Sequence, residues 1–284
     1  LMRNPIFRYY SQFGEDYLLW KFFNFKIEGF FIDIGAFDGI HFSNSYSFEQ
    51  KGWKGICVEA NPDYHDLCYK NRPKSICVHA ACVDDDSKTE SEFLVEKTGL
   101  LSAVSYSEES LKDTKDSTEF YGVEFEGFKK IKVPAVTMNT LLEEKIPKGQ
   151  GIDFVSIDVE GTEIDVLKGF NIQTFKPRLI LVEANNKQAE DKLRYYLERM
   201  NGYHFARKNV VNMFFVRDPE DVKEIQNINI NCVIEKQIHP LGEKFTPHEY
   251  VDGFVIQESD EKAKSQLINE NKQLQNDNNS QQKQ

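Results

Sequence analysis

The strongest structural signal in the chain is the decapeptide Phe30-Phe31-Ile32-Asp33-Ile34-Gly35-Ala36-Phe37-Asp38-Gly39. Its first half is a short apolar run with aromatic and β-branched side chains, which is typical of a buried strand. Gly35 and Gly39 then give the backbone the freedom of a turn that approaches a ligand closely. A carboxylate inside an apolar strand is costly to bury, so Asp33 either binds a ligand or caps N–H groups of the turn. The stretch predicts a strand, a turn and a nucleotide-sized ligand.

A second short apolar run, residues 55–59, ends in Glu59 and precedes a helical pattern that begins near Pro62. Glu59 follows the glycine turn at about the distance expected of the acid that binds ribose hydroxyls in a nucleoside or dinucleotide site. A strand-end glutamate can also be merely solvated. Because the glycine turn precedes it, the ribose-binding interpretation is favoured.

A third apolar run covers residues 75–81, and an adenine ring would lie just after it. Ala81 and Cys82 are small enough to let a ring approach. Asp84, the first of three consecutive acids, is interpreted either as a partner of the adenine amine or as part of a solvated turn.

Two later apolar runs also end in acids. Residues 152–157 and 178–182 form these runs, and the acids that follow them are Asp158, Glu160 and Glu183. In an open α/β sheet ligands bind beyond the carboxyl ends of the strands, so these acids are expected to face the same site as those of the first two strands. The alternative is that Glu160 and Thr162 cap the next helix.

Stretches with helical periodicity alternate with these strands. They cover residues 11–23, 41–50, 62–71, 137–144, 162–169 and 191–200. Residues 203–207 and 210–216 then form a closing antiparallel pair, and residues 130–133 an edge strand that ends before Pro134. The alternation predicts an α/β fold, a doubly wound and mostly parallel sheet with an antiparallel edge hairpin.

The expected organisation is an N-terminal helical segment (residues 1–29), a main domain (30–217), an appendage (218–256) and a disordered or linker tail (257–284). The tail is dominated by Gln, Asn, Lys and Glu and has no aromatic residue, so it cannot bury enough apolar surface to fold alone. The main domain contains an acidic excursion, residues 96–128, in which eight acids stand against three lysines. Long irregular connections are usually functional or disordered, and its aromatic side chains favour a substrate-covering lid.

The net charge of −11 limits the possible partners. Nucleic acids and anionic membranes are held mainly by Lys and Arg, so a small or neutral substrate fits better. No apolar run approaches the length of a membrane span and the start is not a signal peptide, which predicts a soluble, cytoplasmic protein. The Leu1 start is expected of a module cut from a longer polypeptide, or of a tag remnant.

The cysteines carry a separate expectation. They are Cys57, Cys68, Cys77, Cys82 and Cys232, an odd number without the paired short spacing of zinc sites. They are therefore expected to be reduced intracellular thiols that form no metal cage.

Taken together, the motifs resemble the FkbM-type methyltransferases. The matching residues are Ser11-Gln12-x-Gly14-Glu15-Asp16, Phe31-Ile32-Asp33-Ile34-Gly35-Ala36 with Gly39, Ser43-Asn44, Gly52-Trp53-x-Gly55 with Glu59 and Pro62, Asn71-Arg72-Pro73, Asp153-Phe154, Asp158-Val159-Glu160-Gly161, Leu167-x-Gly169, and Arg178 with Val182-Glu183. The resemblance covers residues 11–216. It implies a Rossmann-like class I fold and an S-adenosylmethionine-dependent O-methyltransferase, often of sugar or natural-product hydroxyls. One departure is Phe37, which stands at the middle glycine of the common Asp-x-Gly-x-Gly-x-Gly form.

The resemblance also implies a cofactor-binding set. Its members are Gln12, Asp33, Gly35, Ala36, Gly39, Ser43, Glu59, Ala60, Ala81, Cys82, Asp84 and Asp158. The glycine turn would approach the methionine portion of S-adenosylmethionine, and Gln12 and Ser43 would bind its carboxylate and ammonium region. Glu59 would bind the ribose, and residues 81–84 the adenine.

For catalysis, Asp158 is the expected base, with Glu160 and Glu183 beside it, and most of the rate would come from positioning the two reactants. His41 is an alternative base. The three acids could instead hold a divalent metal ion, which needs only oxygen ligands.

The acceptor is expected to be a sugar or glycan hydroxyl, because aromatic faces stack on sugars while carboxylates accept hydroxyl hydrogen bonds. An RNA ribose 2'-O-methyltransferase or a natural-product O-methyltransferase is the first alternative, and a non-catalytic nucleotide-binding scaffold the second. A nicotinamide oxidoreductase would share the strand-end acid, but residues 35–39 lack the G-x-G-x-x-G fingerprint.

Overall fold

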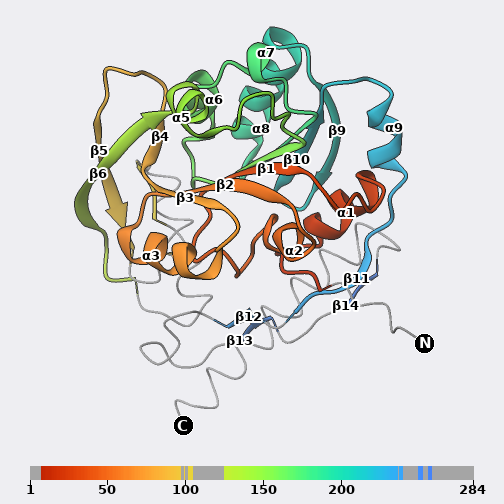
Figure 1. Ribbon diagram of the computed structural model, residues 1–284, viewed down its shortest axis with the longest axis horizontal. Helices are drawn as coiled ribbons and strands as arrows, with labels where there is room; N and C mark the ends of the chain where they lie inside the picture. Colours follow the sequence, from red (N-terminus) through yellow and green to blue (C-terminus); the bar gives the residue numbers. More distant parts are fainter. Residues whose placement is uncertain are drawn as a thin grey trace.

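The computed structural model describes residues 8–96, 99, 102–104, 125–235, 237–238, 249–251 and 255–257. At its centre is a seven-stranded sheet in the order β3-β2-β1-β7-β8-β10-β9 (Figure 1). Its strands are β1 (Phe30–Ile34), β2 (Lys54–Glu59), β3 (Ile76–His79), β7 (Phe154–Ile157), β8 (Leu179–Glu183), β9 (His204–Asn209) and β10 (Asn212–Val216). The first five are mutually parallel, whereas β10 is antiparallel to β8 and β9. The predicted α/β sheet with an antiparallel edge hairpin is confirmed.

The strand order reverses at β1. From there β2 and β3 extend to one side, and β7 and β8 to the other. Ligands of doubly wound sheets bind beyond the carboxyl ends of the strands at such a point. The topology therefore directs attention to the residues that follow β1, β2, β7 and β8.

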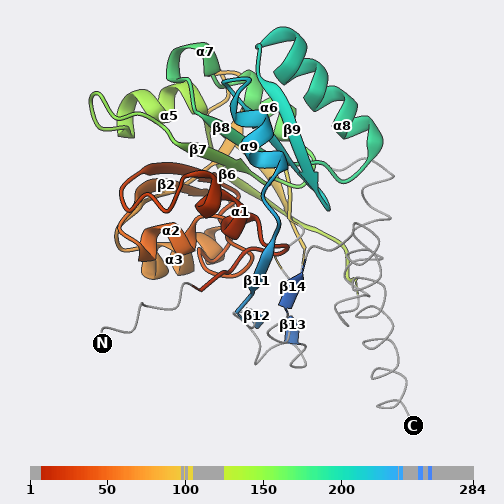
Figure 2. The ribbon, with the colours of Figure 1, turned by 90° about the vertical axis from the view of Figure 1, so that its right-hand side faces the viewer.

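Helices cover both faces of the sheet. One face carries α1 (Glu15–Phe22), α2 (Tyr46–Gln50) and α3 (Pro62–Asn71), and the other carries α5 (Met138–Lys145), α6 (Glu163–Lys168), α7 (Ile172–Phe175) and α8 (Lys187–Arg194) (Figure 2). A π-helix, Tyr195–Met200, continues α8, and α9 (Asp221–Gln226) packs against β9 and α1.

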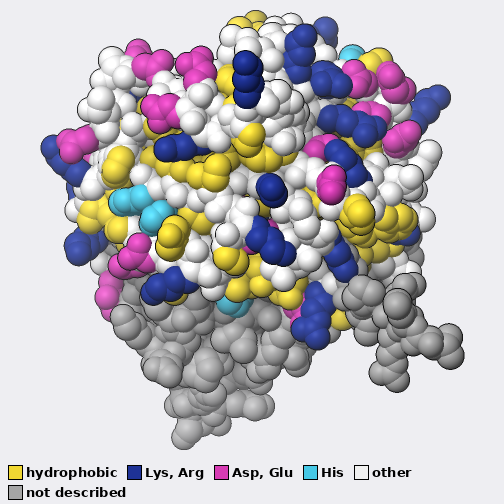
Figure 3. Space-filling view, viewed as in Figure 1, with side chains coloured by type: hydrophobic (Ala, Val, Ile, Leu, Met, Phe, Trp, Pro, Cys, Tyr) yellow, Lys and Arg dark blue, Asp and Glu magenta, His cyan; other side chains and the backbone are white. Residues whose placement is uncertain are grey.

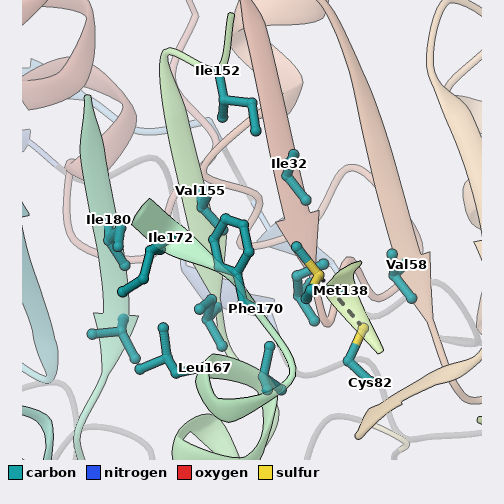
Figure 4. Close-up of a cluster of buried hydrophobic side chains, with 14 of the residues drawn as sticks. Ile32, Val58, Cys82, Met138, Ile152, Val155, Leu167, Phe170, Ile172 and Ile180 are labelled. Atoms are coloured by element: carbon teal, nitrogen blue, oxygen red, sulfur yellow. Dashed lines mark hydrogen bonds between the residues drawn. The ribbon is translucent and has the colours of Figure 1, made fainter. Parts of the chain in front are cut away.

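Side-chain alternation along β1 divides the core between these two faces. Ile32 points to the face that carries α5 to α8, where Val155 and Ile180 of the neighbouring strands join it (Figure 4). Phe31 points to the opposite face and stacks on Phe154, with ring centroids 5.9 Å apart. All of these side chains are completely buried, which fixes the register of β1 in the sheet.

A second, three-stranded sheet has the order β4-β6-β5, with β4 (Ala81–Val83), β5 (Glu90–Val95) and β6 (Lys129–Thr137). Pro134 lies inside β6, so the expected edge strand ending before it is wrong. β4 pairs with β6 only from Ala135 onward, so that ladder begins beyond the residue that lacks an N–H. Two short pairs join β11 (Asn231–Val233) to β14 (Val255–Gln257) and β12 (Gln237–Ile238) to β13 (Glu249–Val251).

The N-terminal segment and residues 221–235 belong to the main core. Ile225 and Ile230 share a buried cluster with Leu18 of α1, and the Glu235 N–H donates to the Tyr9 carbonyl at 2.8 Å. The expected boundary at residue 217 is therefore not a boundary in packing. The apolar islands beyond it complete the face that α1 covers.

Some expected boundaries also shift. The helix expected from residue 41 begins at Tyr46, and the one expected over 191–200 divides into α8 and the π-helix. Most of the acidic excursion, and residues 258–284, lie outside the described residues. Within the described part of the chain, no helix combines the length and the apolar character needed to cross a membrane.

Candidate active site

Four neighbouring strands bring predicted site residues to one edge of the sheet. In the backbone register Ile34 lies opposite Val58 and Ile157, and Ile157 lies opposite Val182. The residues that come next along the four strands are Gly35, Glu59, Asp158 and Glu183. The register therefore gathers the glycine turn and three acids from distant parts of the sequence.

The glycine turn packs directly on the end of β7. Gly35 has a φ of +84°, and a Cβ atom there would lie 1.7 Å from the Asp158 carbonyl oxygen. The N–H groups of Gly35 and Ala36 both donate to the Val58 carbonyl, at 2.9 and 3.0 Å. Gly39 has a φ of +82°. Glycine alone combines this conformation with such a close approach at position 35.

Glu59 is held in one orientation at the end of β2. Its carboxylate accepts hydrogen bonds from the N–H groups of Phe37 (2.8 Å) and Asn61 (2.7 Å). Burial raises the pKa of Glu59 to about 7, although these N–H groups act in the opposite direction. A carboxylate has about four acceptor sites, so this one retains capacity for a ligand hydroxyl.

An aromatic pair lies next to Glu59. The rings of Phe37 and Tyr64 stack with centroids 4.2 Å apart. The Ala80 N–H donates to the Glu59 carbonyl at 3.2 Å, which brings the residue after β3 beside the end of β2. Ala60 and Ala81 pack in one small cluster close by. Sequence reasoning did not identify Tyr64, because its contact depends on the left-handed backbone of Phe37, at φ +51°.

Two members of the expected adenine site point elsewhere. Cys82 lies in the core on the face of α5, with its Sγ 3.8 Å from Met138 Sδ (Figure 4). Asp84 pairs with Lys88 at 2.5 Å and interacts with Lys168 of α6. Neither side chain is directed to the strand ends that carry Glu59. The solvated-turn interpretation describes Asp84, and Cys82 is a core residue.

Asp33 belongs to a buried polar network beneath the turn. It accepts a 2.5 Å hydrogen bond from Ser45 Oγ, which itself accepts one of 2.9 Å from Arg72. Arg72 is fully buried and pairs with Glu49 at 2.8 Å. Burial raises the pKa of Asp33 to about 6, while the charge of Arg72 lowers it. Serine hydroxyls, and not the N–H groups of the turn, satisfy this carboxylate.

Gln12 and Ser43 lie on neighbouring segments. Ser11 forms a parallel bridge with Phe42, which sets Gln12 beside the residues that follow the glycine turn. Ser43 Oγ accepts from the N–H groups of Ser45 and Tyr46, at 3.2 and 3.0 Å, and so caps the start of α2. Their role at the methionine end of a cofactor stays a prediction.

Two buried carboxylates, Glu15 and Asp16, anchor this N-terminal segment. Asp16 accepts from Ser11 Oγ at 2.5 Å and from Ser47 Oγ at 3.0 Å. Glu15 accepts from the side-chain amides of Asn209 and Asn212, at 2.8 and 3.1 Å. These bonds tie the start of α1 to α2 and to the edge hairpin.

The remaining strand-end acids form a cluster. Carboxylate oxygens of Asp158, Glu160 and Glu183 all lie within 4.8 Å of one another. Asp158 and Glu160 are half-buried and Glu183 is buried, with Asn185 Nδ2 donating to its Oε2 at 3.0 Å. Oxygen ligands at this spacing can hold a divalent cation or share protons.

Burial and mutual repulsion raise the pKa values of the cluster. The pKa of Asp158 rises to about 6, chiefly by desolvation, and those of Glu160 and Glu183 rise well above the usual range through desolvation and the charge of Asp158. Carboxyl groups this close together favour a shared proton over three separate charges.

The alternative in which Glu160 and Thr162 cap α6 is wrong. Before the helix, Glu163 Oε1 accepts a hydrogen bond of 2.9 Å from the N–H of Gly161. Thr162 makes no side-chain cap bond. Among the described residues, its Oγ1 is the one buried side-chain nitrogen or oxygen atom without a hydrogen-bond partner. Glu96, at the start of the acidic excursion, is buried and adds negative charge near Glu160. No sequence signal pointed to Glu96 or Glu163.

His41 is paired with an aspartate. Its Nδ1 lies 2.5 Å from Asp38 Oδ2, and the buried Asp38 also accepts from the N–H groups of Ile40 and His41. A carboxylate at Nδ1 fixes the ring orientation, as in acid–base histidines of other enzymes. The pair lies on the segment after the glycine turn, not on the strand ends that carry Asp158 and Glu183.

Three of the cysteines lie together in the fold, and whether they bind a metal ion is not decided by this proximity. The Sγ atoms of Cys57, Cys68 and Cys77 lie within 4.8 Å of one another. Their sequence spacing matches no zinc motif, because the fold brings them from β2, α3 and β3.

A family model described as the methyltransferase FkbM domain matches residues 33–205, which is more than half of the chain. The chain therefore belongs to the FkbM methyltransferase family, whose methyl donor is S-adenosylmethionine. No curated protein sequence matches the chain significantly.

Solved structures of methyltransferases are similar at low identity. The precorrin-6Y C5,15-methyltransferase from Geobacter metallireducens has 13% identity and a TM-score of 0.39, with 71% of this chain and 86% of that one covered. The C-terminal domain of the enzyme of that name from Rhodobacter capsulatus has 12% identity and a TM-score of 0.37, with 86% and 88% covered. An O-methyltransferase from Bacillus cereus, in complex with SAH, has 12% identity and a TM-score of 0.36, with 75% and 84% covered.

Proposed function

We propose that this methyltransferase acts on a hydroxyl group of a sugar or glycan. The observation that carries the proposal is the acid cluster of Asp158, Glu160 and Glu183, whose carboxylates lie within 4.8 Å of one another at the carboxyl edge of the sheet. A hydroxyl must lose its proton when its oxygen is methylated. Carboxylates whose pKa values are raised toward neutrality are suited to accept that proton.

The residues present fit a cationic nucleoside cofactor. When bound, S-adenosylmethionine supplies a methyl group made electrophilic by its sulfonium centre. Glu59 would accept hydrogen bonds from the ribose, the Phe37–Tyr64 pair would lie against the adenine, and Gln12 and Ser43 would hold the methionine end. The buried Thr162 hydroxyl marks a place where a polar group of a ligand completes the hydrogen bonding. The surrounding acids favour a positively charged donor.

Asp158 is the proposed base. The glycine turn contacts its backbone directly, so the carboxylate is fixed relative to the segment that holds the methionine portion. The hydroxyl proton passes to Asp158, whose carboxylate lies within 4.8 Å of those of Glu160 and Glu183. With a pKa of about 6, Asp158 is a stronger base than an ordinary aspartate and is still largely ionised at neutral pH.

The same three acids can instead hold a divalent cation, because they supply oxygen ligands only. Removal of metal ions distinguishes the two cases. Activity that survives a chelator and dialysis supports the base, whereas activity that is lost and then restored by Mg²⁺ supports the cation.

The acceptor is proposed to be neutral and rich in hydroxyls. The acids of the cluster, with Glu96 and Glu163 beside them, repel a phosphate backbone but accept hydrogen bonds from hydroxyls. On the face shown in Figure 3, basic side chains are interspersed with acidic ones and do not form a continuous basic surface. An RNA or natural-product acceptor, and a scaffold without catalysis, are alternatives that the same assay addresses.

The test is mass spectrometry of methyl transfer from S-adenosylmethionine to a panel of nucleotide sugars, oligosaccharides, capped RNA and small phenols. A gain of one methyl group on a saccharide, absent with Asp158→Asn, supports the proposal. Transfer confined to RNA or phenols contradicts the acceptor class. No transfer to any member, by a chain that binds the cofactor in calorimetry, favours the scaffold.

A further inference from the structure

The three-thiol cluster of Cys57, Cys68 and Cys77 is separate from the acid cluster. Cys57 lies in the middle of β2, directly opposite Cys77 of β3, and Cys68 faces both from α3. These side chains lie on the face of the sheet that α1, α2 and α3 cover. The cluster therefore lies under these helices, near the glycine turn, and not at the strand ends that carry the acid cluster.

The spacing of the three sulfurs is that of ligands around one metal ion. The Sγ atoms of Cys68 and Cys77 are 3.8 Å apart, and no pair in the trio exceeds 4.8 Å. Zn²⁺ binds thiolate at about 2.3 Å, which places two sulfurs of a tetrahedral site about 3.8 Å apart. An ion centred among the three sulfurs thus needs only small side-chain movements.

The surroundings are charged, although the cluster lies in an apolar core. Arg72, whose guanidinium is fully buried, lies beside the cluster, because its Cγ and Cys68 Sγ both pack against Gly39. Asp33 lies opposite Cys57 in the neighbouring strand.

The exposure of the three cysteines is also compatible with entry of a metal ion. Cys57 and Cys68 are 1% exposed, whereas Cys77 is partly exposed on the edge strand β3. Cys77 therefore offers a path from solvent to the three sulfurs. On the inner side, Cys68 Sγ and Arg72 Cγ would lie 3.0 and 2.7 Å from a Cβ atom at Gly39.

We propose that Cys57, Cys68 and Cys77 form a three-sulfur site for a thiophilic divalent cation, Zn²⁺ in the first instance. On binding, each coordinating thiol releases its proton to solvent, and no electron is transferred. The ion joins β2, α3 and β3 and so braces the back of the glycine turn. This site is independent of the acceptor and of the methyl-transfer chemistry.

The full chain, reduced and stripped with a chelator, is titrated with Zn²⁺ alone in competition with a chromophoric chelator. Cd²⁺ serves as a second probe, because its bonds to thiolates give an ultraviolet charge-transfer band. One equivalent of metal, a cadmium–thiolate band and a rise in melting temperature are expected. Cys77→Ser is expected to weaken Zn²⁺ binding at least ~100-fold. Cys232→Ser, a buried cysteine outside the trio, is expected to leave it unchanged.

Three results would overturn the proposal. The first is no binding of either metal by the reduced wild-type chain, which needs no variant to fold. The second is zinc binding that Cys77→Ser retains and that gives no cadmium–thiolate band, which would assign the ion to the acid cluster. The third is a purified chain whose Cys68 and Cys77 are joined by a disulfide and bind no metal after reduction.

Discussion

Glu59 shows how a single side chain is prepared for a ligand, because two backbone N–H groups fix its carboxylate before any ligand arrives. Glu59→Gln removes the charge but keeps the size. We expect S-adenosylmethionine to bind more weakly by about 1.5–3 kcal/mol, the contribution of a hydrogen bond to a charged group. Calorimetry measures this, with Glu92→Gln on the exposed side of β5 as the matched control. Equal affinity for wild type and Glu59→Gln would remove Glu59 from the cofactor site.

Asp158→Asn tests the base. The amide keeps the shape but cannot take the hydroxyl proton, so turnover is expected to fall roughly 10²- to 10⁴-fold with little change in cofactor affinity. Asp165→Asn, a half-exposed aspartate of α6, is the control. A joint loss of turnover and cofactor affinity would contradict the assignment of Asp158 as a base. If His41→Asn alone abolished turnover, the Asp38–His41 pair would be the base instead.

Sequence alone can locate residues whose role follows from their place at the end of a strand. Gly35, Glu59, Asp158 and Glu183 are of this kind, because the carboxyl edge of a parallel sheet gathers them whatever the details of packing. The orientation of a side chain within a short strand or turn is not visible in the same way. The contacts of Tyr64, Cys82, Asp84, Glu96 and the three clustered cysteines all depend on such orientation.

At the scale of elements, the glycine turn links β1 to the end of β7. Gly35→Ala places a Cβ atom 1.7 Å from the Asp158 carbonyl at a φ of +84°. The left-handed conformation costs about 1–2 kcal/mol and overpacking about 1–3 kcal/mol more. We therefore expect the free energy of unfolding to fall by about 2–5 kcal/mol, with loss of cofactor binding, as measured by urea denaturation and calorimetry.

Gly127→Ala is the matched control for this turn. Gly127 has nearly the same φ, +87°, but a Cβ atom there meets no atom of the described residues within 4 Å. It should lose only the conformational contribution, about 1–2 kcal/mol, and keep cofactor binding. Equal destabilisation by the two variants would show that the contact with β7 carries no energy.

The strands of the main sheet could be predicted from the sequence more accurately than the ends of helices and the bounds of edge strands. Apolar runs of four to six residues had to be buried, and their order decided the sheet. The start of α2 could not be predicted, because the residues before Tyr46 are held by Asp38 and by the hydroxyl of Ser43. β6 continues through Pro134 because β5 pairs with it up to that residue and β4 pairs with it from Ala135 onward. The local sequence does not show where these two partner strands begin and end.

At the scale of the whole molecule, burial acts on several acids in one direction. It raises the pKa values of Asp16, Asp33 and Asp158 to about 6 and those of Glu59 and Glu163 to about 7, from ordinary values of 3.8 and 4.5. These acids lie on α1, β1, β2 and α6 and directly after β7. The fold therefore concentrates part of the net charge of −11 in its interior.

This concentration predicts the pH dependence of stability. Between the ordinary and the raised pKa values the folded chain binds more protons than the unfolded chain, so the free energy of unfolding falls as pH rises through this window. From about pH 6 to about pH 8, Glu59 alone contributes a loss on the order of 1 kcal/mol. Thermal unfolding followed by circular dichroism should therefore give a lower melting temperature at about pH 8.

The bound cofactor should oppose this trend. A sulfonium and an ammonium group favour the ionised acids, so S-adenosylmethionine should bind with release of protons near pH 6 and should reduce the difference in melting temperature between the two pH values. Calorimetry in two buffers of different ionisation enthalpy measures the released protons. Glu59→Gln should release fewer protons than wild type, whereas Glu92→Gln should match wild type. A melting temperature that is flat or rises from about pH 6 to about pH 8 would show that buried acids do not control stability.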